Sequence, residues 1–235
     1  MPGWADFECT EIDGGKMYQN IIFDLDGTLT DPKEGICKAV QYALKKDGII
    51  VNNLDELEPF IGPPLSESFE EFYGYSHEAA LHAVETYREY YGVTGLFENV
   101  VYEGIENMLK NLKEAGITLA IASSKPKVFI DRILKKFDLT QYFDLVVGAS
   151  LDGSLGKKND IVKKVLEQLG ALEKKEILEK TAMVGDRKFD VCAAIQFGMV
   201  PIAVGYGYGS KEELTESGAE IIVDSVEALE VVLRK

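Results

Sequence analysis

The chain has 235 residues, a length that suits one large domain or one domain carrying a smaller inserted one. Hydrophobic residues make up 46% of it and charged residues 28%, which is typical of a globular protein with a sizeable core. Lys and Arg number 25 against 40 Asp and Glu, and the resulting charge of −15 disfavours nucleic acid and anionic membrane surfaces as partners.

No apolar run reaches the roughly 18 residues of a membrane span, and no signal-like pattern opens the chain, so we expect a cytoplasmic location. Cys9, Cys37 and Cys192 lie far apart, which favours reduced thiols over a disulfide framework or a zinc site. Residues 1–18 lack apolar periodicity and are expected to form an irregular extension, with Met17 as a second candidate for the first residue.

Residues 20–24 form the first of several short apolar runs that each end in polar residues, a pattern typical of buried strands. The later runs lie at 117–123, 143–147, 181–185, 200–204 and 221–223. Helical patterns separate them, at 103–115, 126–137, 159–170, 188–197, 210–217 and 225–233. This alternation predicts an α/β fold with a doubly wound, mostly parallel sheet.

The segment 33–100 breaks this alternation. It contains no convincing strand, a Gly62-Pro63-Pro64 turn interrupts it, and its helical patterns lie near 33–47, 65–73 and 76–91. We therefore predict an inserted helical domain at 33–100 and a main domain made of 19–32 and 101–235. Two crossings between such domains would allow hinge closure over a site.

The run Asp24-Leu25-Asp26-Gly27-Thr28 directly follows the first predicted strand. Because side chains alternate along a strand, Asp24 and Asp26 are expected on one side of it. Neighbouring carboxylates repel unless a cation or a shared proton lies between them, so the pair suits a Mg²⁺ site in which one carboxylate is also a nucleophile. Gly27 allows the sharp turn. The alternative is an ordinary acidic turn, since Asp and Gly are common after strands.

Ser123 and Ser124 follow the predicted strand 117–123, just before Pro126, which suits the start of a helix. Their hydroxyl and backbone N–H groups would bind an anion, although serines in this position more often only cap a helix. Lys158 opens another predicted helix, where a cation is unfavourable unless a phosphate lies beside it. The alternative for Lys158 is an ordinary solvated lysine.

Asp186 and Asp190 follow the predicted strand 181–185 and lie one helical turn apart. They suit one metal ligand and one carboxylate just outside the coordination sphere of the metal. Alternatively, they are acids of a first helical turn that complement the helix dipole. Open α/β sheets bind ligands beyond the carboxyl ends of their strands, where Asp24, Ser123, Lys158 and Asp186 would all meet.

The order D-x-D-G-T, apolar strand ending in Ser, Lys, and then G-D-x-x-x-D resembles the haloacid dehalogenase-like phosphohydrolases from residue 20 to the C-terminus. The insertion resembles the helical C1-type cap of the phosphoglycolate phosphatase-like branch. The resemblance implies a Rossmann-like core, Mg²⁺ as cofactor and a small phosphate monoester as substrate, with 2-phosphoglycolate as the family-level expectation. We expect a monomer or weak homodimer with no further partner.

The resemblance implies that Asp24 is the nucleophile that forms an aspartyl-phosphate, and that Asp26 protonates the leaving oxygen and later deprotonates water. For the first role the Asp26 carboxyl must be protonated near neutral pH. The phosphoryl oxygens would be held by Ser123, Ser124, Lys158 and the turn at Gly27. The implied ligands of Mg²⁺ are Asp24, the Asp26 carbonyl and Asp186, with Asp190 just outside.

Substrate specificity is expected from the insertion, where Gly62 and Pro63 lie in the implied substrate-facing loop and Arg88, with Tyr87 or Tyr91, adds contacts. Aromatic and Arg residues on a helix more often serve packing and solvation, which is the alternative for them. Arg187, inside G-D-x-x-x-D, puts a positive charge near the site entrance and is expected to meet an anionic tail of the substrate.

Four other functions stay open to different degrees. A 5'-nucleotidase or pyrophosphatase is possible because leaving-group preference lies in the cap. A β-phosphoglucomutase-like transferase is less favoured, since 33–92 shows no convincing general acid or base for it. A non-enzymatic phospho-receiver is disfavoured by the large insertion and by the late G-D-x-x-x-D motif.

Overall fold

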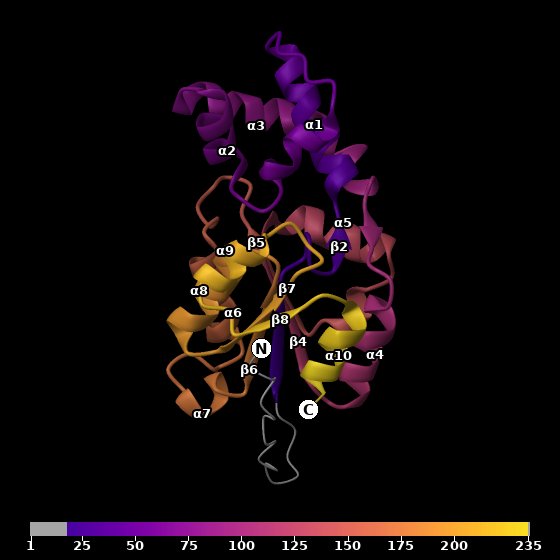
Figure 1. Ribbon diagram of the computed structural model, residues 1–235, viewed down its shortest axis with the longest axis vertical. Coiled ribbons are helices and arrows are strands. Elements are labelled where there is room, and N and C mark those ends of the chain that lie inside the picture. The colour runs from indigo at the N-terminus through magenta and orange to yellow at the C-terminus, as the bar shows by residue number, and fades with distance from the viewer. Residues whose placement is uncertain (1–17, 235) are drawn as a thin grey trace, which may run out of the picture.

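The computed structural model describes residues 18–234, so the predicted extension at 1–18 lies outside them except for Tyr18, whose side chain is buried. One parallel sheet of 6 strands forms the centre of the molecule, in the order β5-β4-β1-β6-β7-β8. Its strands are β1 Asn20–Phe23, β4 Thr118–Pro126, β5 Leu145–Ala149, β6 Thr181–Gly185, β7 Val200–Val204 and β8 Ile221–Val223. The predicted α/β fold and its parallel sheet are confirmed (Figure 1).

Helices cover both faces of this sheet, because side chains alternate along each strand. Ile21 and Phe23 of β1 pack into the larger apolar core, on the side of helices α4 (Ile105–Glu114), α5 (Lys127–Lys136) and α10 (Val226–Leu233). Ile22 packs into the smaller core on the opposite side, with α6 (Lys158–Gln168) and α8 (Lys188–Phe197). Figure 1 shows these two sets of helices to the right and left of the sheet.

Two short helices complete that second side, α7 (Lys175–Leu178) and α9 (Lys211–Glu216). Ser210, directly before α9, is its N-cap residue: its hydroxyl accepts a hydrogen bond from the Glu213 backbone N–H at 3.1 Å. The four-residue α7 was not predicted, because one turn of helix carries too little apolar periodicity to be recognised.

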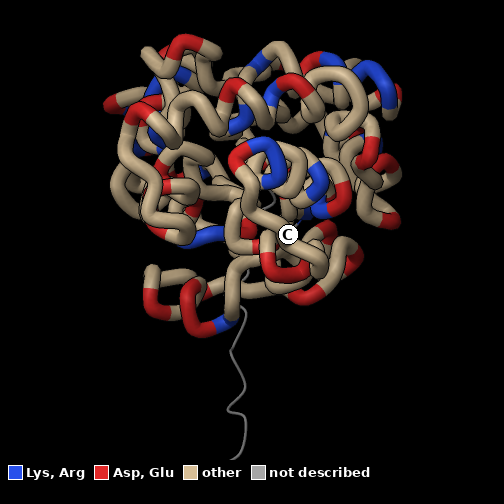
Figure 2. The backbone as a smooth tube through the Cα atoms, turned by 90° about the horizontal axis from the view of Figure 1, so that it is seen from above, with Lys and Arg blue, Asp and Glu red and all other residues tan. Residues whose placement is uncertain are grey.

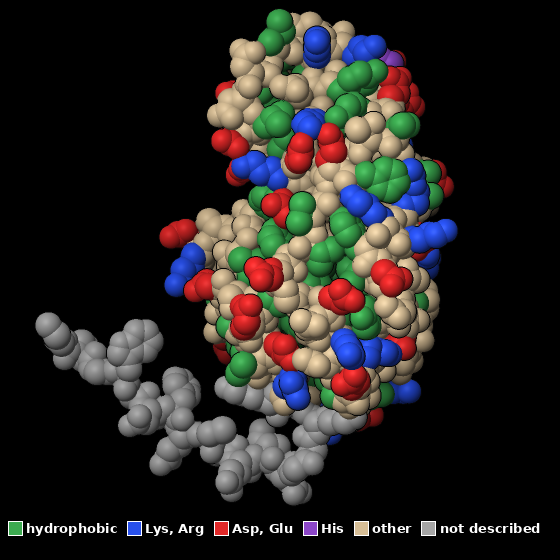
Figure 3. All heavy atoms as spheres, turned by 90° about the vertical axis from the view of Figure 1, so that its right-hand side faces the viewer, with side chains coloured by type: hydrophobic (Ala, Val, Ile, Leu, Met, Phe, Trp, Pro, Cys, Tyr) green, Lys and Arg blue, Asp and Glu red, His purple; other side chains and the backbone are tan. Residues whose placement is uncertain are grey.

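The segment 33–100 folds into the helices α1 (Lys33–Lys46), α2 (Leu65–Tyr73) and α3 (His77–Tyr91), as predicted. They lie beyond the carboxyl ends of the strands, at the top of Figure 1. Short 3-10 helices occur at Leu54–Phe60 and Gly95–Phe97, and in the sheet-containing part at Thr140–Tyr142. The space-filling view shows this helical segment resting on the sheet-containing part, with an indentation between the two (Figure 3).

The two connections to this segment pair with each other, which was not predicted from the sequence. Strands β2 (Thr30–Asp31) and β3 (Val100–Val101) form a small antiparallel ribbon exactly where the chain leaves the sheet-containing part and returns. Strands of two residues show no period of alternation, so the sequence cannot reveal them. The ribbon ties the two connections together.

Acidic and basic residues are mixed over the surface, with acids in excess, as the view from above shows (Figure 2). None of the helices built from residues 18–234 combines the length and apolar character that a membrane crossing requires.

Candidate active site

Asp24 and Asp26 lie directly beyond the carboxyl end of β1, the central strand between β4 and β6, and both are almost fully buried. The Asp24 backbone N–H donates to the Val184 carbonyl at 2.9 Å, which continues the strand pairing up to this residue. Burial raises the pKa of the Asp26 carboxyl; Lys125 acts against this shift and the nearby Asp24 adds to it. A raised pKa favours the protonated form that a general acid needs.

Among the described residues, Lys158 is one of two buried lysines at this edge of the sheet. From the first turn of α6, its Nζ lies 3.0 Å from Asp24 Oδ1 and 2.8 Å from Asp190 Oδ1 and donates to the Ala122 carbonyl at 2.9 Å. Burial lowers the pKa of Lys158, but the charges of Asp190 and Asp24 outweigh it and the net shift is upward. The lysine is therefore charged. The carboxylates of Asp24 and Asp190 compensate its unfavourable position at the start of a helix, whereas the sequence predicted a phosphate in this role.

Asp24, Asp186 and Asp190 form an acidic cluster in which one carboxylate oxygen from each lies within 4.8 Å of the others. Asp186 is 1% exposed; its Oδ2 accepts the Tyr208 backbone N–H at 2.8 Å, and its Oδ1 has no partner among the described residues. Burial, followed by the charges of Asp190 and Asp24, raises the pKa of Asp186 well above its usual range.

The donor set of this cluster fits Mg²⁺, which prefers carboxylate oxygens. An unpartnered buried carboxylate oxygen is costly, and a bound cation would remove that cost. Asp190 has a further structural role, because its Oδ2 accepts the Arg187 backbone N–H at 3.2 Å at the start of α8. Both interpretations of Asp190, as a neighbour of the metal and as a first-turn acid, agree with this position.

Gly27 has a different role from the one implied for it. Its backbone N–H donates to the Thr30 carbonyl at 2.8 Å, so it does not face a phosphate. The residue has φ +77, and a Cβ built on it would lie 2.1 Å from Asp186 Oδ2. Glycine is needed here for its backbone conformation and for the space that the Asp186 carboxylate occupies.

The two serines lie where they were predicted, at the end of β4. Ser123 is 2% exposed and Ser124 is half-buried, and both line the cavity described below. The predicted helix start at Pro126 is one residue early: β4 continues to Pro126 through a bulge, and α5 begins at Lys127. The Ser123 hydroxyl accepts the Lys125 backbone N–H at 3.3 Å.

Lys125 is a second buried cation that the sequence analysis did not select. Its Nζ lies 2.7 Å from Asp26 Oδ2, and its side chain is 5% exposed. A lysine after two serines carries no motif of its own, but its place directly after a strand end that was already marked by Ser123 and Ser124 was a usable signal.

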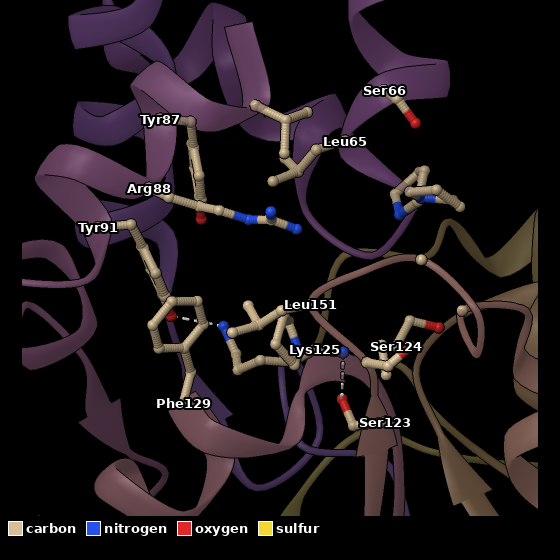
Figure 4. Close-up of a pocket in the computed structure, with 18 of the residues that line it drawn as sticks. Leu65, Ser66, Tyr87, Arg88, Tyr91, Ser123, Ser124, Lys125, Phe129 and Leu151 are labelled. Carbon is tan, nitrogen blue, oxygen red and sulfur yellow. Dashed lines mark hydrogen bonds between the residues drawn. The ribbon is translucent and has the colours of Figure 1, made fainter. Parts of the chain in front are cut away.

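A cavity of about 470 Å³ opens over these groups, between the sheet-containing part and the helical segment. Its floor includes Asp24, Asp26 and Ser123. Its walls are largely apolar and aromatic and include Phe60, Leu65, Leu81, Val84, Tyr87, Tyr91, Phe129 and Leu151. Figure 4 shows Tyr87, Arg88 and Tyr91 descending from α3 toward Lys125 and the serines.

The residues of the helical segment that were predicted to determine specificity line this cavity. Gly62, Pro63 and Pro64 form part of its wall. The Arg88 guanidinium points into the open space in Figure 4, and it makes no hydrogen bond or ion pair within residues 18–234. Arg88 thus contributes a positive charge to the side of the cavity formed by the helical segment.

Arg187 does not point where the sequence analysis expected. Its Nε and NH2 groups donate to the Glu213 carboxylate at 2.9 and 3.2 Å, and NH1 donates to the Ile61 carbonyl at 2.6 Å. The expectation that Arg187 meets an anionic tail of the substrate is therefore replaced: the guanidinium joins α9 to the loop before Gly62.

Comparison with known proteins finds similar chains. The family model described as "Haloacid dehalogenase-like hydrolase" matches residues 21–204. A 5'-nucleotidase of Pseudomonas aeruginosa is 44% identical over 202 residues, 86% of this chain and 89% of that protein. A phosphoglycolate phosphatase of Vibrio vulnificus is 31% identical over 226 residues, 91% of this chain and 95% of that protein.

Among solved structures, one described as a predicted phosphatase from Clostridium acetobutylicum is 45% identical and superposes with a TM-score of 0.87. The match covers 92% of this chain and 98% of that one. The similarity therefore includes the helical segment as well as the sheet.

Proposed function

The chain belongs to the haloacid dehalogenase-like hydrolases, and on that premise we propose that it is a Mg²⁺-dependent phosphatase that hydrolyses small phosphate monoesters through an aspartyl-phosphate intermediate. The observation that carries this proposal is the position of Asp24, whose carboxylate lies 3.0 Å from the Lys158 ammonium group and forms a cluster with the buried carboxylates of Asp186 and Asp190. This arrangement supplies a nucleophile together with positive charge for the transferring phosphoryl group.

In the first step Asp24 attacks phosphorus while the bond to the ester oxygen breaks, and Asp26 gives its proton to that oxygen. In the second step water attacks the phosphorus of the aspartyl-phosphate, Asp26 takes a proton from this water, and the Asp24 carboxylate and inorganic phosphate are released. Ser123, Ser124 and Lys158 bind the phosphoryl oxygens throughout. Asp24, Asp186 and the Asp26 carbonyl would hold Mg²⁺, which supplies positive charge that stabilises the transferring group.

The helical segment 33–100 is proposed to act as a cap over a core formed by 19–32 and 101–235. Its two connections run side by side in the β2–β3 ribbon, so both would move as one hinge. The loop at Gly62 and the inner face of α3 contribute one wall of the cavity, and the strand ends contribute the other.

The size and lining of the cavity favour a substrate with a larger leaving group than glycolate. A volume of about 470 Å³ lies in the range of sites for drug-sized ligands, and its walls carry more aromatic and aliphatic side chains than a two-carbon acid requires. A nucleoside 5'-monophosphate would use this space, with its base against apolar and aromatic residues. We therefore rank nucleoside monophosphates above 2-phosphoglycolate, and the relative that is named a 5'-nucleotidase supports the same ranking.

The test is phosphate release from nucleoside monophosphates, 2-phosphoglycolate, sugar phosphates and pyrophosphate, with Mg²⁺ or with EDTA. We expect Mg²⁺-dependent turnover that falls at least about 10³-fold in Asp24→Asn, because the nucleophile is lost. Asp131→Asn, an exposed acid on α5, serves as the matched control and should keep full activity. Turnover that persists in Asp24→Asn contradicts the proposed mechanism.

The variant Arg88→Ala tests whether this arginine contributes to the choice of substrate. If Arg88 binds the leaving group, this variant raises KM for the preferred ester about tenfold, with kcat nearly unchanged. Arg234→Ala, an exposed residue beyond α10, is the control. A preference for 2-phosphoglycolate over every nucleotide would overturn the ranking without affecting the mechanism.

A further inference from the structure

Lys125 is the buried cation of this site to which the proposed reaction gives no role. Lysine is almost never fully buried unless it is paired, and here the partner is Asp26 Oδ2, 2.7 Å from Nζ. The other carboxylate oxygen, Asp26 Oδ1, is buried and has no partner among the described residues. The contact with Lys125 therefore distinguishes the two oxygens of the Asp26 carboxyl.

Tyr91, at the end of α3, holds the same lysine from the opposite side. Its hydroxyl accepts a hydrogen bond from Lys125 Nζ at 2.5 Å, drawn as a dashed line in Figure 4. The ammonium group also lies 4.6 Å from the centroid of the Tyr91 ring, within the range of a cation–π contact. The cation is thus held between a carboxylate of the sheet-containing part and a phenol of the helical segment.

The Tyr91 ring is itself fixed by its neighbours. It stacks on Tyr87, one turn earlier in α3, with centroids 5.1 Å apart and an interplanar angle of 16°, and it meets the edge of Phe129 from α5 at 5.4 Å. The side chain is 1% exposed. Because Tyr91 cannot move by itself, the position of its hydroxyl reports the position of α3 over the strand ends.

We propose that Lys125 and Tyr91 are positioning residues that couple the docking of α3 to the orientation of the Asp26 carboxyl. Lys125 occupies Oδ2 and so directs the free Oδ1 toward the ester oxygen, and Tyr91 keeps Lys125 in that place only while α3 lies over the site. This inference rests on the proposed role of Asp26 as the general acid. Neither positioning residue exchanges a proton: the proton moves from Asp26 Oδ1 to the leaving oxygen as its bond to phosphorus breaks.

Esters whose leaving groups differ in basicity can distinguish a positioning role for Lys125 and Tyr91 from a role in packing alone. An alkoxide needs a proton as it departs, so hydrolysis of a nucleoside 5'-monophosphate depends on a well-oriented acid, whereas 4-nitrophenolate leaves without one. Asp26 also deprotonates water in the hydrolysis step that both esters share, so the readout is the single-turnover rate of leaving-group release. We expect Tyr91→Phe to lower this rate about tenfold for the nucleotide, with KM within about twofold, and to change it less than about twofold for 4-nitrophenyl phosphate. Lys125→Met is expected to show the same selectivity with a loss of about 10²-fold on the nucleotide.

Tyr90→Phe is the matched control. The hydroxyl of Tyr90 donates to Glu98 Oε2 at 3.0 Å, outside the cavity, so this variant should keep both activities. Thermal unfolding of each variant checks the fold. The double variant Tyr91→Phe with Lys125→Met should lose no more activity than Lys125→Met alone, because the tyrosine acts through the lysine.

Equal losses in leaving-group release from both esters, or fully additive losses in the double variant, would overturn the coupling, since either result means that the two residues act independently of the general acid. These outcomes are distinct from a failure of the proposed function. That failure would appear in the unmodified protein, as turnover that does not depend on Asp24.

Discussion

Gly27 illustrates how a single position serves the site without touching a substrate. Its positive φ lets the chain turn after Asp26, and the absence of a side chain leaves room for the Asp186 carboxylate. Gly207 has a similar task on the other side of Asp186, where a Cβ would lie 2.4 Å from that of the aspartate. The Asp186 side chain can therefore occupy its position only because Gly27 and Gly207 have no side chains.

Replacing Gly27 with alanine is expected to lower kcat by about 100-fold or more, because the new Cβ would displace the Asp186 carboxylate from the site. Gly48→Ala is the matched control: Gly48 has φ +82 but nothing within 4 Å of its added Cβ. It should be destabilised by about 1–3 kcal/mol through backbone strain and keep its kcat. Urea unfolding and steady-state kinetics of both variants test this, and similar activities of the two would refute it.

At the scale of secondary-structure elements, the site depends on connections between helices and loops that are distant in sequence. Helix α9 begins beside α8, and Glu213 in its first turn binds both the Arg187 side chain and the Lys188 backbone N–H, the latter at 2.9 Å. Arg187 continues this connection to the Ile61 carbonyl in the loop that lines the cavity. Two helices of the sheet-containing part thus hold one loop of the helical segment.

The Glu213 carboxylate should make this connection dependent on pH. Burial raises its pKa, but the hydrogen bonds from Arg187 and the Lys188 backbone outweigh burial, and the net shift is downward. A group whose pKa is lowered by folding stabilises the protein above its unfolded pKa, about 4.3 for Glu, and loses this contribution as the pH falls through the folded pKa. Glu213→Gln should therefore be less stable by about 1–2 kcal/mol at pH 7.

That difference should shrink as the pH approaches and passes below the folded pKa of Glu213, and urea unfolding of the two proteins across this range measures it. Glu212→Gln is the matched control, because Glu212 lies in the same first turn, is exposed and experiences the same helix dipole. A difference between Glu213→Gln and the unmodified protein that is constant with pH would contradict the assignment.

At the scale of the whole molecule, the active site is a source of instability. The acidic cluster holds three buried carboxylates, of which only Asp24 and Asp190 contact the Lys158 ammonium group, in a chain whose formal charge is already −15. Like charges in a buried site raise the free energy of the folded state unless a cation compensates them. We therefore expect that the proposed binding of Mg²⁺ at Asp186 stabilises the folded protein.

Without metal, Asp186→Asn should be more stable than the unmodified protein, with a melting temperature higher by about 2–4 °C for each kcal/mol of repulsion removed. Mg²⁺ at 100 times Kd should raise the free energy of unfolding of the unmodified protein by about 2.7 kcal/mol, and with it the melting temperature. The melting temperature of Asp186→Asn should not change when Mg²⁺ is added. Differential scanning calorimetry with Mg²⁺ or EDTA tests this, with Asp131→Asn as control. A Mg²⁺ response in Asp186→Asn equal to that of the unmodified protein would exclude Asp186 as a ligand.

The order of the elements and the strand ends that carry polar groups could be predicted from the amino-acid sequence. Apolar runs such as 181–185 need both faces covered, so they predict strands of a parallel sheet, and the residues that follow them must lie at one edge. Asp24, Ser123, Lys158 and Asp186 could be selected in this way because each lies in the last part of a strand, directly follows a strand or opens a helix.

The pairing of these groups could not be predicted, because it depends on contacts between distant parts of the chain. The contact between Lys125 and Tyr91 joins residues 34 positions apart, and the contact between Arg187 and Ile61 joins residues 126 positions apart. Periodicity and turn chemistry describe neighbours along the chain, whereas such contacts depend on how the helical segment docks on the strand ends. The same reason explains why Gly27 was assigned to a phosphate: the sequence contains no sign that Asp186 occupies the space beside it.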